Sequence, residues 1–532
     1  MSEASVPVPT GESGGTQHGW GAAAAQPDPR RWLVLVVIAI AQLMVVLDAT
    51  VMNIALPSAQ NALHFTNVDR QWVVTAYSLS FGSLLLFGGR LADLVGRRVM
   101  FITGLAGFAV ASAVGGASVS FSMLVAARAC QGVFGAILAP AALSLLATTF
   151  TDPKERGKAF GIYGSVAAGG GAVGLLLGGA LTSYLSWRWC LYINLFFAGL
   201  AIVGALAFLH GRSGPRQADL DIPGVLLVSS GVFCLVYGFS NAATHSWGTP
   251  STYLFLVAGV VLLAVFAFWM SRARSPLMPP RVVLDRNRGA AYLGILLAGA
   301  GMFGIFLFVT YYLQDTLHYS PVITGVAFLP MVACIAIASN LSNIVLMPRI
   351  GPKPIISAGL TLAAVGMTLF TRIGLHSGYA GTILPALLVT GLGMGLMFST
   401  AFNTGTYGVS PRDAGVASAM VNTGQQLGGS IGTSLLNTIF ASAAAGYVTS
   451  QVSSLHVRPS AALIQGVQAS AVVHGYIVAF WWVAGIFLFG AVVCGSLMRR
   501  GPLQPLAHGT PAASDSAEEV SVEATDPVTT PE

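Results

Sequence analysis

Fourteen mostly apolar stretches, each close to twenty residues long or longer, run through this chain of 532 residues. An α-helix needs about 20 apolar residues to cross the hydrocarbon core of a bilayer. Only 8% of the residues are charged, against about 25% in a soluble domain, so the chain cannot cover so much apolar surface with water-facing groups. The sequence therefore predicts an all-α membrane protein with 14 transmembrane helices. The predicted spans lie near residues 32–56, 71–89, 99–118, 121–149, 158–185, 189–209, 222–241, 252–270, 289–313, 322–346, 354–373, 380–402, 414–442 and 474–497.

The basic residues of the connecting loops are concentrated on one side of these spans. Of the 25 Lys and Arg residues, only four lie in the opposite loops (Arg70, Arg188, Arg372 and Arg458), and Arg128 lies within a span. Cytoplasmic loops of membrane proteins carry the excess of Lys and Arg. We therefore expect a multi-pass protein of the inner (cytoplasmic) membrane with both termini in the cytoplasm.

Both ends of the chain have the composition of disordered segments. Residues 1–29 are rich in Gly, Ala, Pro and Ser, and they lack the basic start and short apolar core of a signal peptide. Residues 501–532 are rich in Pro, Ser and Thr and become acidic. We expect both segments to be disordered cytoplasmic tails.

Two short motifs recur along the chain at nearly the same spacing. Gly96–Leu105 resembles Gly351–Leu360, and Gly170–Gly174 resembles Gly428–Gly432, with offsets of 255 and 258 residues. Gly157 and Gly415 share the second offset. Repeated halves of this kind in transporters place the substrate near the midplane between them. The predicted organisation is an N-terminal six-helix bundle at 30–213, a two-helix insert with its linker at 214–288, and a C-terminal six-helix bundle at 289–500.

The familiar sequence signatures of enzymes and of nucleic-acid binding are not found. None of the three lysines precedes Ser or Thr, which excludes a Walker A phosphate loop, and the nine histidines show no metal-ligand spacing. Gly428–Gly432 matches G-x-S-x-G, but it lies within a predicted span, where helix packing explains it better. The basic residues form no continuous stripe. We expect neither an enzyme nor a nucleic-acid partner, metal or other cofactor.

Asp48 and Arg128 are charged residues inside predicted spans. At about 1.5 Å per residue, both lie roughly 10–12 Å below the outer ends of their helices. A charge at this depth is costly unless it is paired or faces a watery cavity. One interpretation is a structural ion pair between the first and fourth helices. The other, which we favour, is a proton-coupling site whose proton affinity depends on conformation.

The short segment after the second predicted span combines glycines with acidic and basic residues. Its residues allow a tight turn, a helix cap and an acid–base latch, although a plain cytoplasmic anchor of positive charge would also explain the arginines. The residues of this cytoplasmic gate loop are Gly89, Asp93, Gly96, Arg97 and Arg98.

This loop resembles the signature loop of the major facilitator superfamily. The resemblance covers nearly all of residues 30–500 and is closest to the fourteen-helix branch of drug:proton antiporters. Leu47–Pro57 resembles the first-helix motif of that branch, and Arg128–Gly132 resembles its fourth-helix motif. The resemblance implies the major facilitator fold, coupling roles for Asp48 and Arg128, and a gate role for the loop.

The fifth predicted span resembles the antiporter motif of these exporters with one departure. Gly170, Gly174 and Gly178 recur every four residues, which permits close approach of another helix. The family usually has Pro after the second of these glycines, whereas this chain has Leu175. Without that proline we expect Gly178 and Gly179 to supply any flexibility of the helix.

Buried amides are the best candidates for contact with a substrate, because each needs a hydrogen-bonding partner. A lining of amides and aromatic rings fits a bulky, mostly apolar organic molecule with a few polar groups. The candidate substrate-binding residues are Asn53, Gln131, Asn340, Asn343, Asn422, Gln425 and Gln426.

We therefore expect a proton-coupled antiporter that exports small amphipathic compounds, as in antibiotic or multidrug efflux. Its partners would be the substrate, protons and the lipid bilayer, and it would act as a monomer driven by the proton gradient. One alternative is a dedicated exporter or importer of a single metabolite, such as a siderophore or a self-made natural product. Another is a membrane sensor or assembly partner that does not transport.

Overall fold

The computed structural model describes most of the chain between residues 29 and 502. The predicted tails, 1–29 and 501–532, lie almost wholly outside the described residues. The described ranges are 29–65, 67–209, 221–242, 247–273, 276–410, 412–454 and 461–502.

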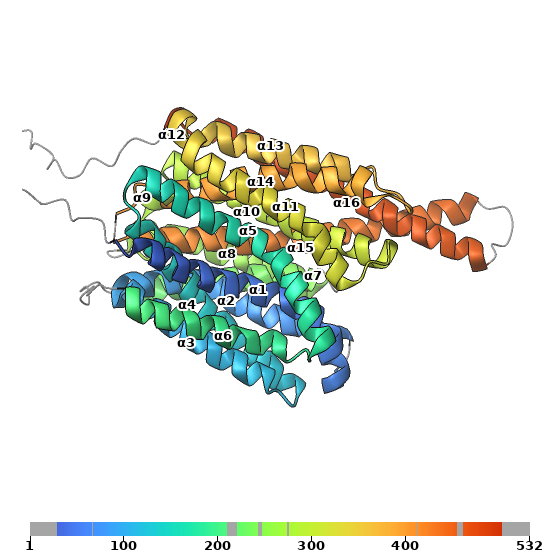
Figure 1. Ribbon diagram of the computed structural model, residues 1–532, viewed down its shortest axis with the longest axis horizontal. Helices are drawn as coiled ribbons and strands as arrows, with labels where there is room; N and C mark the ends of the chain where they lie inside the picture. The colour runs from blue at the N-terminus through green and yellow to red at the C-terminus, as the bar shows by residue number, and fades with distance from the viewer. Residues whose placement is uncertain are drawn as a thin grey trace, which may run out of the picture.

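Every regular element in the described part of the chain is helical (Figure 1). Three π-helical turns, at Tyr312–Thr316, Ser342–Leu346 and Tyr379–Ile383, join or extend the α-helices. The α-helices are α1 (Arg31–Leu63), α2 (Asn67–Val95), α3 (Arg97–Gly116), α4 (Phe121–Thr149), α5 (Pro153–Tyr184), α6 (Trp189–Phe208), α7 (Ile222–Ala242), α8 (Pro250–Arg272), α9 (Pro280–Val283), α10 (Arg286–Tyr311), α11 (Pro321–Leu341), α12 (Met347–Ile350), α13 (Pro352–Phe370), α14 (Leu384–Thr406), α15 (Ala414–Ser454) and α16 (Ala461–Leu497).

The number of membrane spans agrees with the prediction. Among the described residues, 13 helices are long and apolar enough to cross a bilayer. The two segments of α5, 153–171 and 173–184, meet at an angle of 42° and make a fourteenth span when they are counted as one. The predicted all-α membrane architecture is therefore confirmed.

The long helices run side by side along one axis (Figure 1). Helices α3 and α6 lie along one flank and α13 along the other, and α1 begins at the same end of the bundle where α16 finishes. We call this end, which carries Arg31, Arg97 and Arg499, the basic end. Helices α7 and α8 pack together, and α7 contacts both α2 and α15. The division into two six-helix bundles and an insert stays a prediction.

The residues of the internal repeat have equivalent surroundings in the structure. A Cβ added to Gly170 would meet Val46 of α1, and Gly174 faces α1 in the same way. Gly428 and Gly432 of α15 lie equally close to the backbone of α10. In both cases the glycines allow one helix to approach an earlier one closely, α5 against α1 and α15 against α10.

The same correspondence holds at the two glycines that precede α3 and α13. Gly96 and Gly351 have φ angles of 115° and 75°, in the region that favours glycine. Each lets the chain turn sharply between one long helix and the next.

Helices α15 and α16 extend past the rest of the bundle at the end opposite the basic end (Figure 1). They contain 41 and 37 residues, so at about 1.5 Å per residue each is longer than the roughly 30 Å of a bilayer core. The predicted spans ended at residue 442 and resumed at 474. The intervening helical extension was missed because its many small polar residues make it too weakly apolar to be recognised as part of a membrane span.

Candidate functional site

Asp48 of α1 and Arg128 of α4 lie against each other among the N-terminal helices. Arg128 Nη1 donates a 2.6 Å hydrogen bond to Asp48 Oδ2, and each residue is only 1% exposed. The guanidinium also donates from Nε to the Val73 carbonyl of α2 at 3.3 Å and lies 4.5 Å from the ring centroid of Tyr77. The structure thus brings together the two charges that sequence placed at one depth, while their role in proton coupling stays a prediction.

Two amides complete the surroundings of the Asp48 carboxylate. Gln131 Nε2 donates to Asp48 Oδ1 at 3.0 Å, and Asn194 Nδ2 of α6 donates to the same oxygen at 2.7 Å. Ser112 Oγ of α3 accepts from the same two amide nitrogens at 2.7 and 3.4 Å. The carboxylate therefore accepts three hydrogen bonds, one of them from the Arg128 guanidinium.

This polar cluster lies inside the N-terminal helices, away from the region where they meet the C-terminal ones. Its members come from α1, α3, α4 and α6, and no described hydrogen-bond partner of Asp48 comes from α10–α16. Sequence analysis missed Asn194 and Ser112. The signal for Asn194 was present, since it is a single amide within the apolar span 189–209.

The prediction of a loop at this point is wrong for most of its residues, because Gly89 and Asp93 lie in α2, which continues to Val95, and α3 begins at Arg97. The contacts of these residues connect α2 to α15. Both oxygens of Asp93 accept the backbone N–H of Gly415 at 3.0 Å, and Arg97 Nη2 donates to Asp93 Oδ1 at 3.3 Å. Gly415 is the second residue of α15, so a buried carboxylate lies against the positive end of a helix dipole. The acid–base latch expected from the sequence is therefore formed, and it reaches across to the C-terminal helices.

Glycines on both sides make this contact possible. A Cβ on Gly89 would lie 2.5 Å from the Gly415 carbonyl oxygen, and a Cβ on Gly415 would lie 2.2 Å from the Gly89 carbonyl oxygen. Arg98 acts differently, because its Nη2 donates at 3.4 Å to the Leu206 carbonyl of α6. Gly96 provides the turn described above, so only part of the predicted loop crosses to the other half.

Arg156 makes a second connection between N-terminal and C-terminal helices, from α5 to α14. Sequence analysis counted this residue only as a basic loop residue. Its Nε donates to Asn403 Oδ1 at 2.9 Å and its Nη2 to Thr406 Oγ1 at 2.9 Å, both on α14. Its Nη1 donates to the Ala147 carbonyl of α4 at 2.7 Å. The residue is 7% exposed, and its guanidinium lies 4.6 Å from the Phe160 ring centroid. The sequence signal was its place next to Gly157, the repeat partner of Gly415.

The amide of Asn343 extends this connection into α11. Asn403 Nδ2 donates to Asn343 Oδ1 at 2.9 Å, and Asn343 Nδ2 donates to Ser399 Oγ at 2.6 Å. Asn343 lies in the π-helical turn that follows α11, and a Cβ on Gly157 would lie 2.6 Å from its carbonyl oxygen. In this conformation the predicted substrate amide is therefore used in contacts between helices.

The glycines of the predicted antiporter motif line the contact of α5 with α1. Gly174 and Gly178 face Thr50 and Val51, and Gly170 faces Val46 as described above. The 42° bend of α5 falls between 171 and 173, next to the run Gly169–Gly171. The bend thus precedes Gly178 and Gly179, whose contribution to the flexibility of α5 stays a prediction.

The remaining substrate candidates are scattered. Asn340 and Asn422 each donate to the carbonyl four residues earlier in their own helix, at 2.8 and 2.9 Å. Gln425 and Gln426 are half-buried on α15. Asn53 lies in α1, and its side chain is outside the described part of the chain. Their roles in substrate binding stay predictions.

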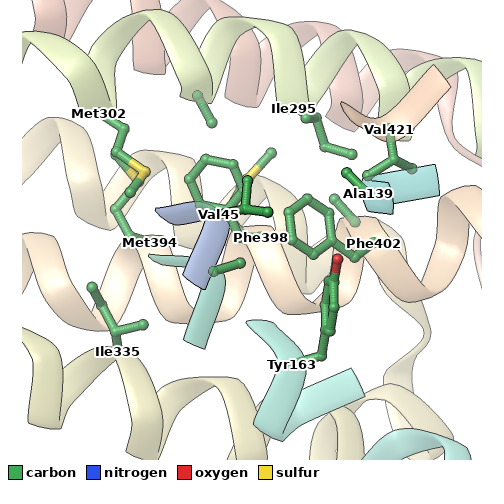
Figure 2. Close-up of a cluster of buried hydrophobic side chains, with 14 of the residues drawn as sticks. Val45, Ala139, Tyr163, Ile295, Met302, Ile335, Met394, Phe398, Phe402 and Val421 are labelled. Carbon is green, nitrogen blue, oxygen red and sulfur yellow. The ribbon is translucent and has the colours of Figure 1, made fainter. Parts of the chain in front are cut away.

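A cluster of apolar side chains fills the centre of the molecule, where N-terminal and C-terminal helices meet (Figure 2). Among the side chains labelled in Figure 2, Tyr163 carries a hydroxyl, which donates to Gln42 Oε1 at 2.8 Å. Met302 and Met394 lie close to each other at one side of this cluster. The labelled members are Val45, Ala139, Tyr163, Ile295, Met302, Ile335, Met394, Phe398, Phe402 and Val421.

Comparison with known proteins identifies one family and several related resistance and export proteins. The family model described as Major Facilitator Superfamily matches residues 38–433. The puromycin resistance protein of Streptomyces alboniger is 49% identical over 479 residues, which cover 90% of this chain and 93% of that protein. The cephamycin export protein of Amycolatopsis lactamdurans is 39% identical, with 77% of this chain and 85% of that protein covered.

A third relative and one solved structure extend the comparison. The tetracenomycin C resistance and export protein of Streptomyces glaucescens is 34% identical, with 78% and 76% of the two chains covered. A crystal structure of a human organic anion transporter superposes with a TM-score of 0.58 at 16% identity, covering 88% of this chain and all of that one. At this identity the likeness concerns the fold alone.

Proposed function

This chain belongs to the major facilitator superfamily, and from that premise we propose that it exports small amphipathic organic molecules, antibiotics among them, in exchange for protons. The proposed transporter lies in the cytoplasmic membrane with both termini inside and works as a monomer. It is driven by the proton gradient alone, without a cofactor, and carries out no chemical reaction on its substrate.

The observation that carries the proposal is the buried pair of Asp48 and Arg128. As a carboxylate, Asp48 neutralises Arg128 at 2.6 Å. Protonation of Asp48 would leave a buried guanidinium without its counter-charge, and losing one partner of a buried pair costs about 3–5 kcal/mol. The protonated protein therefore favours a conformation that hydrates Arg128 or pairs it again. This gives a proton the means to change the conformation.

Proton and substrate use different places in this scheme. Asp48 is bonded within the N-terminal helices, whereas the apolar cluster of Figure 2 lies between the two sets of helices. The two ligands therefore do not compete for one side chain. Coupling passes through the tilt of the N-terminal helices against the C-terminal ones, as in other transporters with repeated halves.

The central cluster indicates the kind of substrate. Methionine side chains adapt to irregular shapes, and phenylalanine rings offer broad apolar contact. The Tyr163–Gln42 pair adds one hydrogen-bonding position. These features suit a bulky, largely apolar molecule with a few polar groups. Puromycin is the first candidate, because the puromycin resistance protein is the 49% identical relative, and cephamycin and tetracenomycin C follow.

The latches at the basic end define one conformation of the proposed cycle. Asp93 holds α2 to α15, and Arg156 holds α5 to α14. With the basic end in the cytoplasm, this conformation is closed to the cytoplasm. One proton moving down about 150 mV yields roughly 3.5 kcal/mol, enough for a several-hundred-fold gradient of a neutral substrate.

Everted membrane vesicles test the proposal. Puromycin, cephamycin and tetracenomycin C are added singly to energised vesicles, and proton release is followed with a pH-sensitive dye. We expect at least one compound to release protons, and Asp48→Asn to abolish the response at an unchanged protein level. Asp315→Asn, which alters an exposed acid after α10, is the matched control and should respond normally.

Other outcomes point to the alternatives. A response confined to one compound would favour a dedicated exporter over multidrug efflux. No release with any compound of a broad panel, with the protein verified in the membrane, would overturn antiport and favour a sensor or assembly partner.

A further inference from the structure

Asn194 contacts the Asp48 carboxylate from α6, a helix to which the sequence assigned no function. Its Nδ2 donates to Asp48 Oδ1 at 2.7 Å, and the residue is fully buried. Asn194 Oδ1, by contrast, has no hydrogen-bond donor among the described residues. A buried amide oxygen without a partner is uncommon and calls for an explanation.

The neighbouring amide, Gln131, is fixed in one orientation. Its Oε1 accepts from Arg128 at 2.8 Å, and its Nε2 donates to both Asp48 and Ser112. Turning this amide over would break three hydrogen bonds. Asn194 has no such restraint on its oxygen, so it is the member of the cluster that can turn over.

Rotation of the Asn194 amide by half a turn would place Oδ1 where Nδ2 now lies, 2.7 Å from Asp48 Oδ1. That oxygen cannot face a carboxylate, but it can accept the O–H of a protonated Asp48. The Ser112 hydroxyl, which now accepts from this amide, could then donate to it. One amide atom lacks a partner in either orientation, so the exchange costs no hydrogen bond.

We propose that Asn194 is a positioning residue for the proton-coupling acid, with its amide N–H toward the Asp48 carboxylate and its amide oxygen toward the protonated acid. This inference rests on the proposed function, since it requires Asp48 to take up a proton. Asn194 would let the buried site accommodate both protonation states without opening to water.

Three other titratable or charged groups face Asp48 from the helices packed around it. Arg128 of α4 forms the ion pair, Tyr77 of α2 lies under the guanidinium, and the Cys190 thiol lies one turn from Asn194 on α6. None of them can exchange donor and acceptor toward Asp48 by turning over as a primary amide can.

A pH titration of the purified full-length protein in lipid nanodiscs tests the proposal without any substrate. Infrared difference spectra report the carboxylic-acid C=O stretch, and only the band that Asp48→Asn removes is followed. Asn194→Leu is a variant of similar volume. It removes a charge-assisted hydrogen bond from the charged form of Asp48, but only a weaker, neutral hydrogen bond from the protonated form. We expect the midpoint of the band to rise by about one pH unit.

A second variant and a control keep the result interpretable. Asn194→Asp offers only oxygen atoms, and two carboxyl groups at this distance share a proton, so the midpoint should rise further than in Asn194→Leu. Asn194→Asp still tests the proposal if Asn194→Leu fails to insert into the membrane. Asn241→Leu removes amide hydrogen bonds to Ser251 and Thr252, neither of which is bonded to Asp48, and it should leave the midpoint unchanged.

The outcomes separate this inference from the proposed function. If Asp48→Asn removes no band, Asp48 does not titrate, and the proposed coupling itself fails. If the Asp48 band is present but its midpoint is unchanged in the Asn194 variants, or shifts equally in Asn241→Leu, the role of Asn194 is overturned and the proposed function stands.

Discussion

Replacing Arg156 by methionine should open the basic end of the molecule. The guanidinium donates two hydrogen bonds across to α14, to Asn403 Oδ1 and Thr406 Oγ1, each 2.9 Å long. Methionine keeps much of the apolar contact with Phe160 but cannot donate to either acceptor. The substitution therefore removes a polar connection between the N-terminal and C-terminal helices at this end.

The size of the effect follows from these two bonds. A hydrogen bond to a charged group contributes about 1.5–3 kcal/mol. We use the lower value for each bond, because both acceptors, Asn403 Oδ1 and Thr406 Oγ1, belong to neutral side chains. The conformation closed at the basic end should lose about 3 kcal/mol, which lowers the ratio of closed to open molecules about 100-fold.

Distance measurements between two spin labels can follow this ratio. Lys158→Cys on α5 and Arg349→Cys on α12 are exposed at the basic end of opposite halves, and the five native cysteines are replaced first. Arg156→Met should add a longer distance to the distribution. Lys154→Met, an exposed change in the first turn of the same helix, should not. Equal distributions in the two variants would refute the reasoning.

Three further predictions concern packing and orientation. Gly415→Leu should abolish transport in vesicles although the protein is inserted, because its Cβ would lie 2.2 Å from the Gly89 carbonyl oxygen and keep α2 from α15. Leu175→Pro should lower the melting temperature only slightly, because α5 already bends by 42° between residues 171 and 173, one turn before the proline. Ser450→Cys should react with a membrane-impermeant maleimide on intact cells, whereas Arg499→Cys should react only after permeabilisation.

Each of these predictions has its control or its contrary result. A Cβ added to Gly446 would meet nothing within 4 Å, so Gly446→Leu should transport normally. An equal loss of transport in Gly446→Leu and Gly415→Leu would contradict the close contact of α2 and α15. Leu181→Pro breaks a straight part of α5 and should cost about 3 kcal/mol of stability; a smaller loss there than at residue 175 would argue against a preformed bend. Labelling of both cysteines from one side would overturn the predicted orientation.

Much of the architecture could be predicted because it depends on local properties of the chain. The length of an apolar stretch sets whether a helix can span the bilayer. The fixed rise of a helix let the sequence place Asp48 and Arg128 at one depth, and the structure brings them within 2.6 Å. The contact between Asp93 and Arg97 was predictable because the two residues are four positions apart, whereas the contact of Asp93 with Gly415 was not.

Other features could be settled only by how each helix is rotated about its axis and which neighbours it contacts. The depth of a residue along its helix does not determine which neighbour it faces. It could not predict that Asn194 of α6 faces Asp48, or that Asn343 faces Ser399 of α14 rather than a substrate. Arg156 is a loop cation by composition and becomes a buried connection only because α5 crosses α11 and α14. The length of an apolar stretch fixes the length of a membrane helix and the depth of its residues, but the packing of whole helices decides which polar side chains meet.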